Sequence, residues 1–104
     1  MILRLSKSAK RDLQGISQYT QKTWGLEQEE LYLNALFSRL EQIKEDPKRW
    51  RNRDELFLGS QSAPIGKHVI FFNIQNEIVQ VARILHQQMD FVQHLDVTDF
   101  EAEE

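Results

Sequence analysis

Three histidines are the side chains best suited to chemistry in this sequence. His68, His86 and His94 could exchange protons near neutral pH, or ligate a metal with Asp90 or Glu77 as a carboxylate partner. Their spacing matches neither HExxH nor an HxH pair, the patterns that bring two imidazoles to one ion. The sequence therefore predicts no metal site and leaves the histidines as acid–base candidates.

Composition excludes sulfur chemistry and the common nucleotide sites. The chain has no cysteine, which rules out disulfides, cysteine-ligated zinc or iron–sulfur centres, and a thiol nucleophile. Its four glycines, at positions 15, 25, 59 and 66, have neither the P-loop nor the dinucleotide-binding spacing. We therefore expect no cofactor.

The segment from residue 44 to residue 55 is the densest cationic stretch, and it surrounds an aromatic side chain. Five basic residues flank Trp50: Lys44, Lys48, Arg49, Arg51 and Arg53. Guanidinium groups pair with phosphate and an indole stacks on bases, so this composition suits a nucleic-acid or protein-docking surface. Four acids in the same stretch offset most of the charge, and the alternative is a solvated loop with Trp50 packed onto the helices.

Arg83 lies in the apolar run from Val81 to His86. In a regular strand it shares a face with Val79, Val81 and Leu85, where an unpaired charge would be costly. A carboxylate or exposed backbone carbonyls must compensate it. We favour a structural ion pair over an arginine that faces a ligand across an open sheet.

Length and charge limit the class of protein. The 104 residues suffice for one domain with its own core, without metal or disulfide staples. The 13 Lys and Arg against 16 Asp and Glu give a net charge of -3, but five of the acids fall after residue 95. We predict a single domain over residues 1–95 and an acidic, flexible tail over residues 96–104.

No stretch indicates export or membrane insertion. Arg4 interrupts the N-terminal apolar stretch, and the longest later one, Val69–Phe72, is far shorter than the ~18 residues of a membrane span. The sequence predicts a soluble protein of the cytoplasm.

The first half of the chain has helical periodicity after a short strand. Ile2–Leu5 alternates apolar and polar side chains, and Ser6 or Ser8 can cap the helix that follows. This helix should end at Gly25, and a second should run from about Leu26 to Asp46-Pro47, antiparallel to the first. The apolar stripes of the two helices are Ala9, Leu13, Ile16 and Thr20, then Leu33, Leu36, Leu40 and Ile43.

Two residues of the first helix carry further expectations. Gly15 costs a helix about 1 kcal/mol relative to alanine, which suggests close packing at that position. Trp24, at the end of the helix, is assigned to the core.

The second half changes to the pattern of an antiparallel meander. His68–Ile74 and Glu77–His86 read as strands joined by a turn at Gln75-Asn76, Gln61–Ile65 adds an earlier strand, and Met89–Leu95 a short helix. The predicted fold class is α+β. An N-terminal strand is followed by an antiparallel helical hairpin, which packs on an antiparallel sheet of three to four strands. The N-terminal strand lies at an edge of this sheet or beside the last strand. A short C-terminal helix ends the domain.

An ordered series of short motifs extends over most of the chain. In order they are Tyr19-Thr-Gln-Lys-Thr-Trp24-Gly25, Gln28 with Tyr32-Leu33, Asp46-Pro47, Arg53-Asp54-Glu55-Leu56, Pro64-x-Gly66-x-His68-Val69-Ile70-Phe71-Phe72 and Arg83-Ile84-Leu85-His86-x-x-Met89-Asp90. This series, over about residues 2–95, resembles the ParE branch of the RelE/ParE toxins of bacterial toxin–antitoxin systems. The strand, helical hairpin and antiparallel sheet of those toxins are compatible with the elements above.

The resemblance implies one of two activities. Toxins like RelE cut mRNA in the ribosomal A site, whereas toxins like ParE are not nucleases and poison DNA gyrase. Phosphodiester cleavage needs a base, an acid and cations at the phosphate. From Gln61 to Leu95 the fixed cations are Lys67 and Arg83 alone, which favours a gyrase poison without catalytic residues. The alternative is a ribosome-dependent mRNA endonuclease, with His68, Arg83, His86 and His94 as catalytic candidates.

The resemblance also implies two partners. A ParD-like antitoxin, a small dimeric DNA-binding protein with a disordered tail, would bind apolar grooves of the hairpin and sheet or add a strand to a sheet edge; its candidate contacts are Leu26, Tyr32 and Phe37. DNA gyrase would bind a basic and aromatic surface, for which the candidates are Arg49, Trp50, Arg51, Arg53 and Arg83. A third possibility is a module that has lost toxicity and only titrates the antitoxin.

Overall fold

The chain begins with a short strand and two long helices, as the periodicity predicts. The structure is a computed structural model and describes residues 1–101. β1 (Ile2–Leu5) is followed by α1 (Lys7–Trp24) and α2 (Leu26–Glu45). Ser6 caps α1: its Oγ accepts a hydrogen bond from the Ala9 N–H at 2.9 Å and donates one to the Ala82 carbonyl at 2.6 Å. The cap therefore satisfies a free helix donor and also ties the start of α1 to the sheet.

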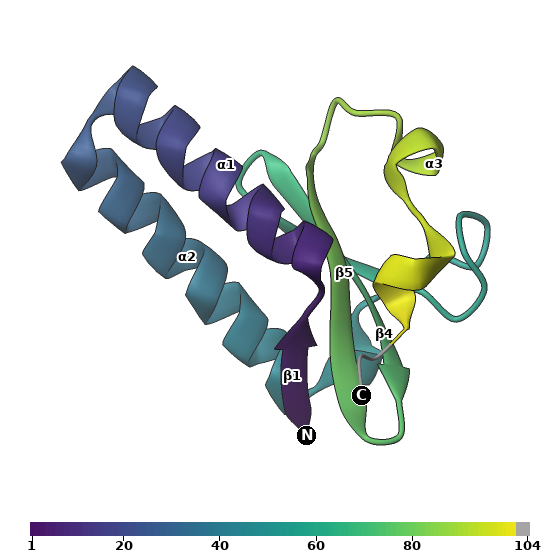
Figure 1. The fold of residues 1–104 in the computed structure, drawn as a ribbon. Helices are drawn as coiled ribbons and strands as arrows, with labels where there is room; N and C mark the ends of the chain where they lie inside the picture. The colour runs from purple at the N-terminus through teal and green to yellow at the C-terminus, as the bar shows by residue number, and fades with distance from the viewer. Residues whose placement is uncertain (102–104) are drawn as a thin grey trace.

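A single residue joins the two helices. Gly25 has a φ of 96°, which residues with a Cβ rarely adopt, and its N–H closes α1 on the Gln21 carbonyl at 2.9 Å. The short link makes the helices antiparallel, and Figure 1 shows the tip of this hairpin projecting away from the sheet. Trp24, at that tip, is 68% exposed, so its assignment to the core was wrong. The expected close packing at Gly15 was also wrong, because a Cβ at this position would meet nothing within 4 Å beyond the adjacent backbone of its own helix.

Five strands form one sheet in the order β1-β5-β4-β3-β2, against the three to four predicted. After the short 3-10 helix η1 (Pro47–Arg49) come β2 (Arg51–Asn52), β3 (Gln61–Ile65), β4 (His68–Gln75) and β5 (Ile78–His86). The antiparallel meander of the last three strands is confirmed, and so is the place of β1 at an edge beside β5. Because β1 runs parallel to β5, the sheet is mixed and not purely antiparallel. β2 was not predicted, since two residues are too few to show a periodicity.

The turn between β4 and β5 lies one residue later than predicted. Gln75 pairs with Ile78, so the turn residues are Asn76 and Glu77. Both have positive φ, 50° and 64°, as in the two-residue hairpin turn whose twist matches that of the strands. Asparagine tolerates this conformation better than glutamate does.

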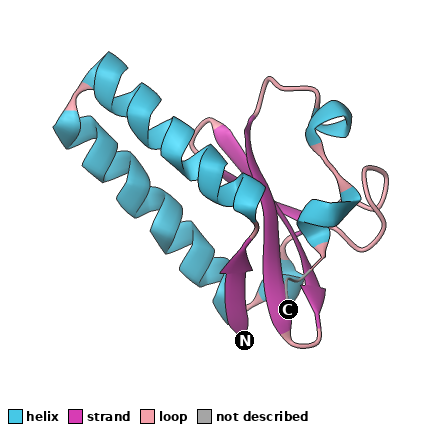
Figure 2. Cartoon of the chain, in the orientation of Figure 1, coloured by secondary structure: helices cyan, strands magenta, loops and turns pink. Residues whose placement is uncertain are grey.

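The main core lies between the hairpin and one face of the sheet. Figure 2 shows both long helices on the same side of the strands. The buried apolar residues of the two helices are Ala9, Ile16, Leu36, Leu40 and Ile43. They meet Ala63, Ile70, Phe72, Val79, Val81 and Ile84 of the sheet. Burial of one large apolar side chain contributes about 1.5–3 kcal/mol, so this layer supplies much of the stability. The two predicted helical stripes are confirmed, with Leu13 and Leu33 half-buried at the margin.

A second, smaller core covers the opposite face of the sheet. Phe71, Ala82 and Leu85 are buried there together with Phe100. After α3 (Phe91–His94) the chain forms the 3-10 helix η2 (Val97–Phe100) on this side of the sheet (Figure 1). Phe100 is 1% exposed, and its ring stacks on that of Phe57 with 4.3 Å between centroids. Residues 97–100 of the predicted tail thus form a 3-10 helix that the buried Phe100 ring holds against the second core, and residues 102–104 lie outside the described part of the chain.

Among residues 1–101, no helix combines the length and the apolar character that a bilayer span requires.

Candidate functional site

A β-bulge in β5 changes the environment of Arg83. Phe71 lies opposite Arg83 but Phe72 lies opposite Val81, so Ala82 is the extra residue on β5. Val81 consequently packs in the main core, whereas Leu85 packs in the core on the opposite face. The expectation that Arg83 shares one face with both residues was wrong, because it assumed an unbroken alternation.

Asp12 of α1 neutralises Arg83 through a two-point contact. The carboxylate accepts hydrogen bonds from Arg83 Nε at 2.8 Å and Nη2 at 2.9 Å, and its Oδ2 also accepts one from the Ile84 N–H at 2.9 Å. Arg83 Nη1 donates a further bond to the His94 carbonyl at 2.7 Å. The hydrogen bond to Asp12 raises the pKa of Arg83, so the guanidinium stays charged. The predicted structural ion pair is confirmed.

Tyr32 of α2 reaches the turn between β3 and β4 and contacts His68. The Tyr32 hydroxyl lies 2.6 Å from His68 Nδ1 and accepts a hydrogen bond from the Lys67 N–H at 3.1 Å. The ring of His86, the cross-strand partner of His68, meets it edge to face with 5.4 Å between centroids. Burial, and then repulsion from His86, lowers the pKa of His68. Tyr32 and His68 thus share one hydrogen bond, the Tyr32 hydroxyl also donates to the Ile65 carbonyl at 3.3 Å, and burial raises the pKa of that phenol.

The four nuclease candidates do not form one cluster. His68 and His86 are in ring contact, but Arg83 is held by Asp12, and His94 contributes its backbone carbonyl while its side chain is exposed. The imidazoles of His68 and His86 are thus adjacent, but the Arg83 guanidinium is paired with Asp12 and does not join them. No group of three or more potential metal ligands occurs within residues 1–101.

Arg53 is held inside the fold although the sequence places it among the docking candidates. Its Nε pairs with Glu55 at 3.0 Å and its Nη1 donates to Ser62 at 3.2 Å. The guanidinium also lies over the rings of Phe71 and Phe91, at 5.6 and 5.7 Å from their centroids. The hydrogen bond from Arg53 lowers the pKa of Glu55. Arg53 therefore joins the loop before β3 to the second core.

Trp50 is half-buried against the main core and carries two arginines on its ring. The guanidinium carbons of Arg49 and Arg39 lie 4.6 and 5.0 Å from the ring centroid. Arg49 and Arg51 are exposed, and neither forms an ion pair within the described residues. Sequence reasoning missed Arg39, because it comes from α2 and no spacing pattern links it to Trp50.

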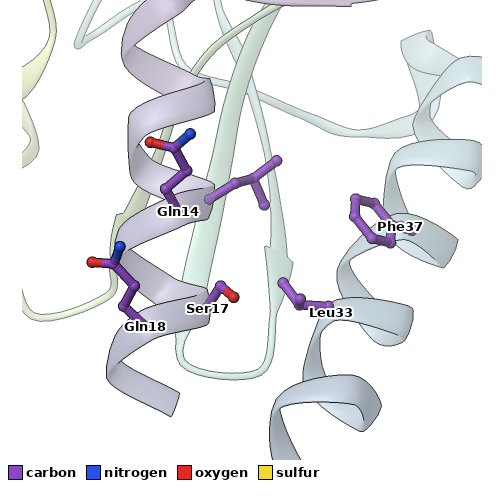
Figure 3. Close-up of a pocket in the computed structure, with 6 residues that line it drawn as sticks. Gln14, Ser17, Gln18, Leu33 and Phe37 are labelled. Atoms are coloured by element: carbon purple, nitrogen blue, oxygen red, sulfur yellow. The ribbon is translucent and has the colours of Figure 1, made fainter. Parts of the chain in front are cut away.

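A groove of about 280 Å³ lies between α1 and α2 (Figure 3). Its lining residues are Leu13, Gln14, Ser17, Gln18, Leu33 and Phe37. Figure 3 shows Leu33 and Phe37 of α2 on one side and the polar side chains of α1 on the other. Ser17 also hydrogen-bonds to Glu29, which joins the two helices beside the groove.

The three antitoxin candidates differ in exposure. Phe37 lines the groove and is 49% exposed, and Leu26 at the hairpin tip is 66% exposed. Tyr32 instead turns toward His68 and is only partly accessible. Exposed aromatic and aliphatic side chains that the sequence reading did not propose as antitoxin contacts also lie on the hairpin: Tyr19, Trp24 and Leu31.

Comparisons with known proteins identify the family. Residues 3–91 match the family model described as ParE toxin of type II toxin-antitoxin system, parDE. Toxin ParE1 of Caulobacter vibrioides is 36% identical over 92 residues, which cover 88% of this chain and 95% of that protein. Toxin ParE1 of Mycobacterium tuberculosis is 33% identical over the same share of this chain and 94% of its own.

The fold has a counterpart among solved structures. A chain of the chromosomal ParDE TA system from P. aeruginosa superposes with a TM-score of 0.74 at 16% identity, covering 83% of this chain and 95% of that one. The order of strand, helical hairpin and meander is therefore shared. With residues 3–91 matching the family model, this chain belongs to the ParE toxin family of type II toxin–antitoxin systems.

Proposed function

We propose that this toxin arrests growth by binding DNA gyrase and stabilising its cleaved complex with DNA, without catalysis of its own. The observation that carries the proposal is the Asp12–Arg83 ion pair, which occupies the only arginine between Gln61 and Leu95. Lys67 is then the one free cation of that region, too little to stabilise the charge of a phosphorane. Inhibition by binding needs no such group, since a ligand that prefers the cleaved complex raises its population.

Contacts inside the fold support a smaller candidate surface for gyrase than the sequence alone proposes. Arg53 and Arg83 are less suited to docking, because internal partners hold both guanidinium groups. Arg49 and Arg51 remain exposed beside the half-buried Trp50. We therefore place the gyrase contact at η1 and β2, where charge on the toxin is free to meet a partner.

The test is a gyrase cleavage assay with purified toxin and supercoiled plasmid. We expect linear DNA covalently linked to gyrase to accumulate, and cells that express the toxin alone to form filaments with damaged DNA. Unaltered supercoiling at micromolar toxin would overturn the proposal. Because gyrase acts on the chromosome, the proposal places the toxin in the cytoplasm.

We also infer that a ParD-like antitoxin neutralises the toxin by binding the hairpin. The groove between α1 and α2 and the exposed Leu26 and Phe37 offer an apolar track for an amphipathic helix. A disordered antitoxin tail that folds on binding could follow this track along the projecting hairpin and form a hetero-oligomer.

A pair of matched variants tests this placement. Leu26→Asp with Phe37→Asp should weaken antitoxin binding by at least about 100-fold, because both apolar contacts are replaced by charges that must be desolvated. Leu58→Asp is the control, since Leu58 is 82% exposed but lies on the loop before β3. Equal affinity of both variants in calorimetric titrations would place the antitoxin elsewhere.

The contact between His68 and His86 supports a second candidate function, ribosome-dependent cleavage of mRNA. Two adjacent imidazoles can act as base and acid at a ribose 2′-hydroxyl. Cleavage by the wild type that is lost in a His86→Ala, His94→Ala variant would favour this alternative over gyrase. Tight antitoxin binding without any effect on growth would instead indicate a module that only titrates antitoxin.

A further inference from the structure

We propose that Arg39, Arg49 and Trp50 form a cradle that binds a phosphate of the DNA backbone. The inference rests on the proposed function, because the DNA in question is the segment that gyrase holds. It adds to that function a direct contact between toxin and DNA, and it includes Arg39, a residue outside the docking candidates.

The cradle is assembled from two elements, α2 and η1, and from the residue that follows η1. Arg39 comes from α2, Arg49 from η1, and Trp50 follows η1 and packs its ring against the main core. Both guanidinium groups lie over the indole, at 5.0 and 4.6 Å from its centroid. Because the core holds the ring and the ring holds the arginines, little side-chain freedom is left to lose when a ligand binds.

The charges of the cradle are unbalanced. Neither Arg39 nor Arg49 forms an ion pair among residues 1–101, although Arg53 and Arg83 both do. Arg39 Nη1 donates to the Pro64 carbonyl, which orients the group without neutralising it. Two cations on one aromatic ring repel each other, and an anion between them would remove this repulsion. The Trp50 Nε1 donor is also buried without a hydrogen-bond partner in the described part of the chain.

The surroundings favour a nucleic-acid backbone over a single small anion. Lys48 and Arg51, on either side of Arg49 and Trp50, are exposed and extend the positive charge from η1 to β2. A row of cations suits the regularly spaced phosphates of a duplex, and guanidinium forks pair with phosphate oxygens through two hydrogen bonds. An acidic segment of a protein is the competing ligand, and the absence of duplex binding would favour it.

Trp50 itself provides the probe. Trp24→Phe leaves Trp50 as the single tryptophan, and Trp24 is exposed enough that this change should leave the fold intact. Titration of this full-length chain with a short DNA duplex at low salt should change the Trp50 fluorescence. Added salt should weaken binding with the slope of two to three released counterions, roughly 0.9 per phosphate contact. Inorganic phosphate is the second arm, and it should bind far more weakly than the duplex.

Variants of the two arginines complete the test. Arg49→Gln and Arg39→Gln should each weaken duplex binding about 10-fold. Arg39→Lys keeps the charge but loses the two-point contact of a guanidinium, so its affinity should lie between those of the wild type and Arg39→Gln. Lys22→Gln is the matched control, because it removes an exposed cation at the other end of the hairpin. Circular dichroism should show that all four variants are folded. If Arg39→Gln does not fold, the Arg49→Gln variant alone decides the outcome, because Arg49 is exposed.

The gyrase assay separates the inference from the function on which it rests. Arg49→Gln should reduce both duplex binding and the yield of cleaved complex, and Lys22→Gln should reduce neither. Wild-type toxin that poisons gyrase but shows no DNA binding, or an Arg49→Gln toxin that loses DNA binding yet still poisons, would overturn the cradle and leave the function standing. Arginine-dependent DNA binding without any effect on gyrase would support the cradle and overturn the function.

Discussion

Asp12 and Arg83 lie 71 positions apart in sequence and form a bidentate ion pair that joins α1 to the bulge of β5. The same carboxylate also accepts a hydrogen bond from the Ile84 N–H at 2.9 Å. One side chain thus neutralises a half-buried charge and satisfies a backbone donor. The helical hairpin, the last strand and, through the His94 carbonyl, α3 are connected at this point.

Loss of Asp12 should therefore destabilise the toxin. Asp12→Ala leaves the Arg83 guanidinium and the Ile84 N–H without their acceptor. We expect the free energy of unfolding to fall by about 2–3 kcal/mol. Asp12→Asn keeps an acceptor for Ile84 and should cost less. A double-mutant cycle with Arg83→Ala in urea unfolding measures the coupling, and additive single effects would contradict the ion pair's role.

Substitution by alanine should change the stability of the toxin in opposite directions at two glycines. Gly15 lies inside α1 with open space around it, so Gly15→Ala should stabilise by about 0.5–1 kcal/mol through helix propensity. Gly66 has a φ of 55°, and a Cβ there would lie 2.7 Å from the Tyr32 ring, so Gly66→Ala should destabilise. Thermal unfolding of the two variants checks both signs; a stable Gly66→Ala protein would rule out the close approach of Tyr32.

His68 should make the toxin less stable in mild acid. Its pKa is lowered below the ordinary 6.5 by burial and by His86, so the unfolded chain binds the proton more readily than the folded one. Its contribution to stability is complete above about pH 6.5, and it declines as the pH falls from there toward the folded-state pKa. His68→Gln should flatten this decline in urea unfolding measured at several pH values. His94→Gln, with an exposed side chain, should retain it, and parallel curves for wild type and His68→Gln would refute the assignment.

Phe100 should be needed for full stability although it lies in the acidic C-terminal region. Its ring is 1% exposed and stacked on Phe57, so Phe100→Ala should cost about 3 kcal/mol. Val97→Ala, at a 52% exposed position of the same 3-10 helix, should cost less than about 0.5 kcal/mol. Chemical unfolding compares the two, and similar midpoints would mean that residues 97–100 do not contribute to the second core.

The sequence by itself determined the elements and the family. Helical spacing from Ala9 to Thr20 and from Leu33 to Ile43 placed both long helices, and β-branched and aromatic runs placed β4 and β5, because each element must bury one face. The ordered motifs agreed with the ParE family model over residues 3–91. These are local properties, carried by neighbours along the chain.

Only the tertiary structure decided which side chains remain available to a partner. Arg49, Arg53 and Arg83 are all candidates by sequence, yet Arg53 and Arg83 form ion pairs with Glu55 and Asp12, and no carboxylate of residues 1–101 forms one with Arg49. The parallel place of β1, the bulge at Ala82 and the burial of Phe100 likewise depend on contacts between segments far apart in sequence. Charge compensation and burial are set by which segments meet in space, and a one-residue bulge is enough to change the face on which a side chain lies.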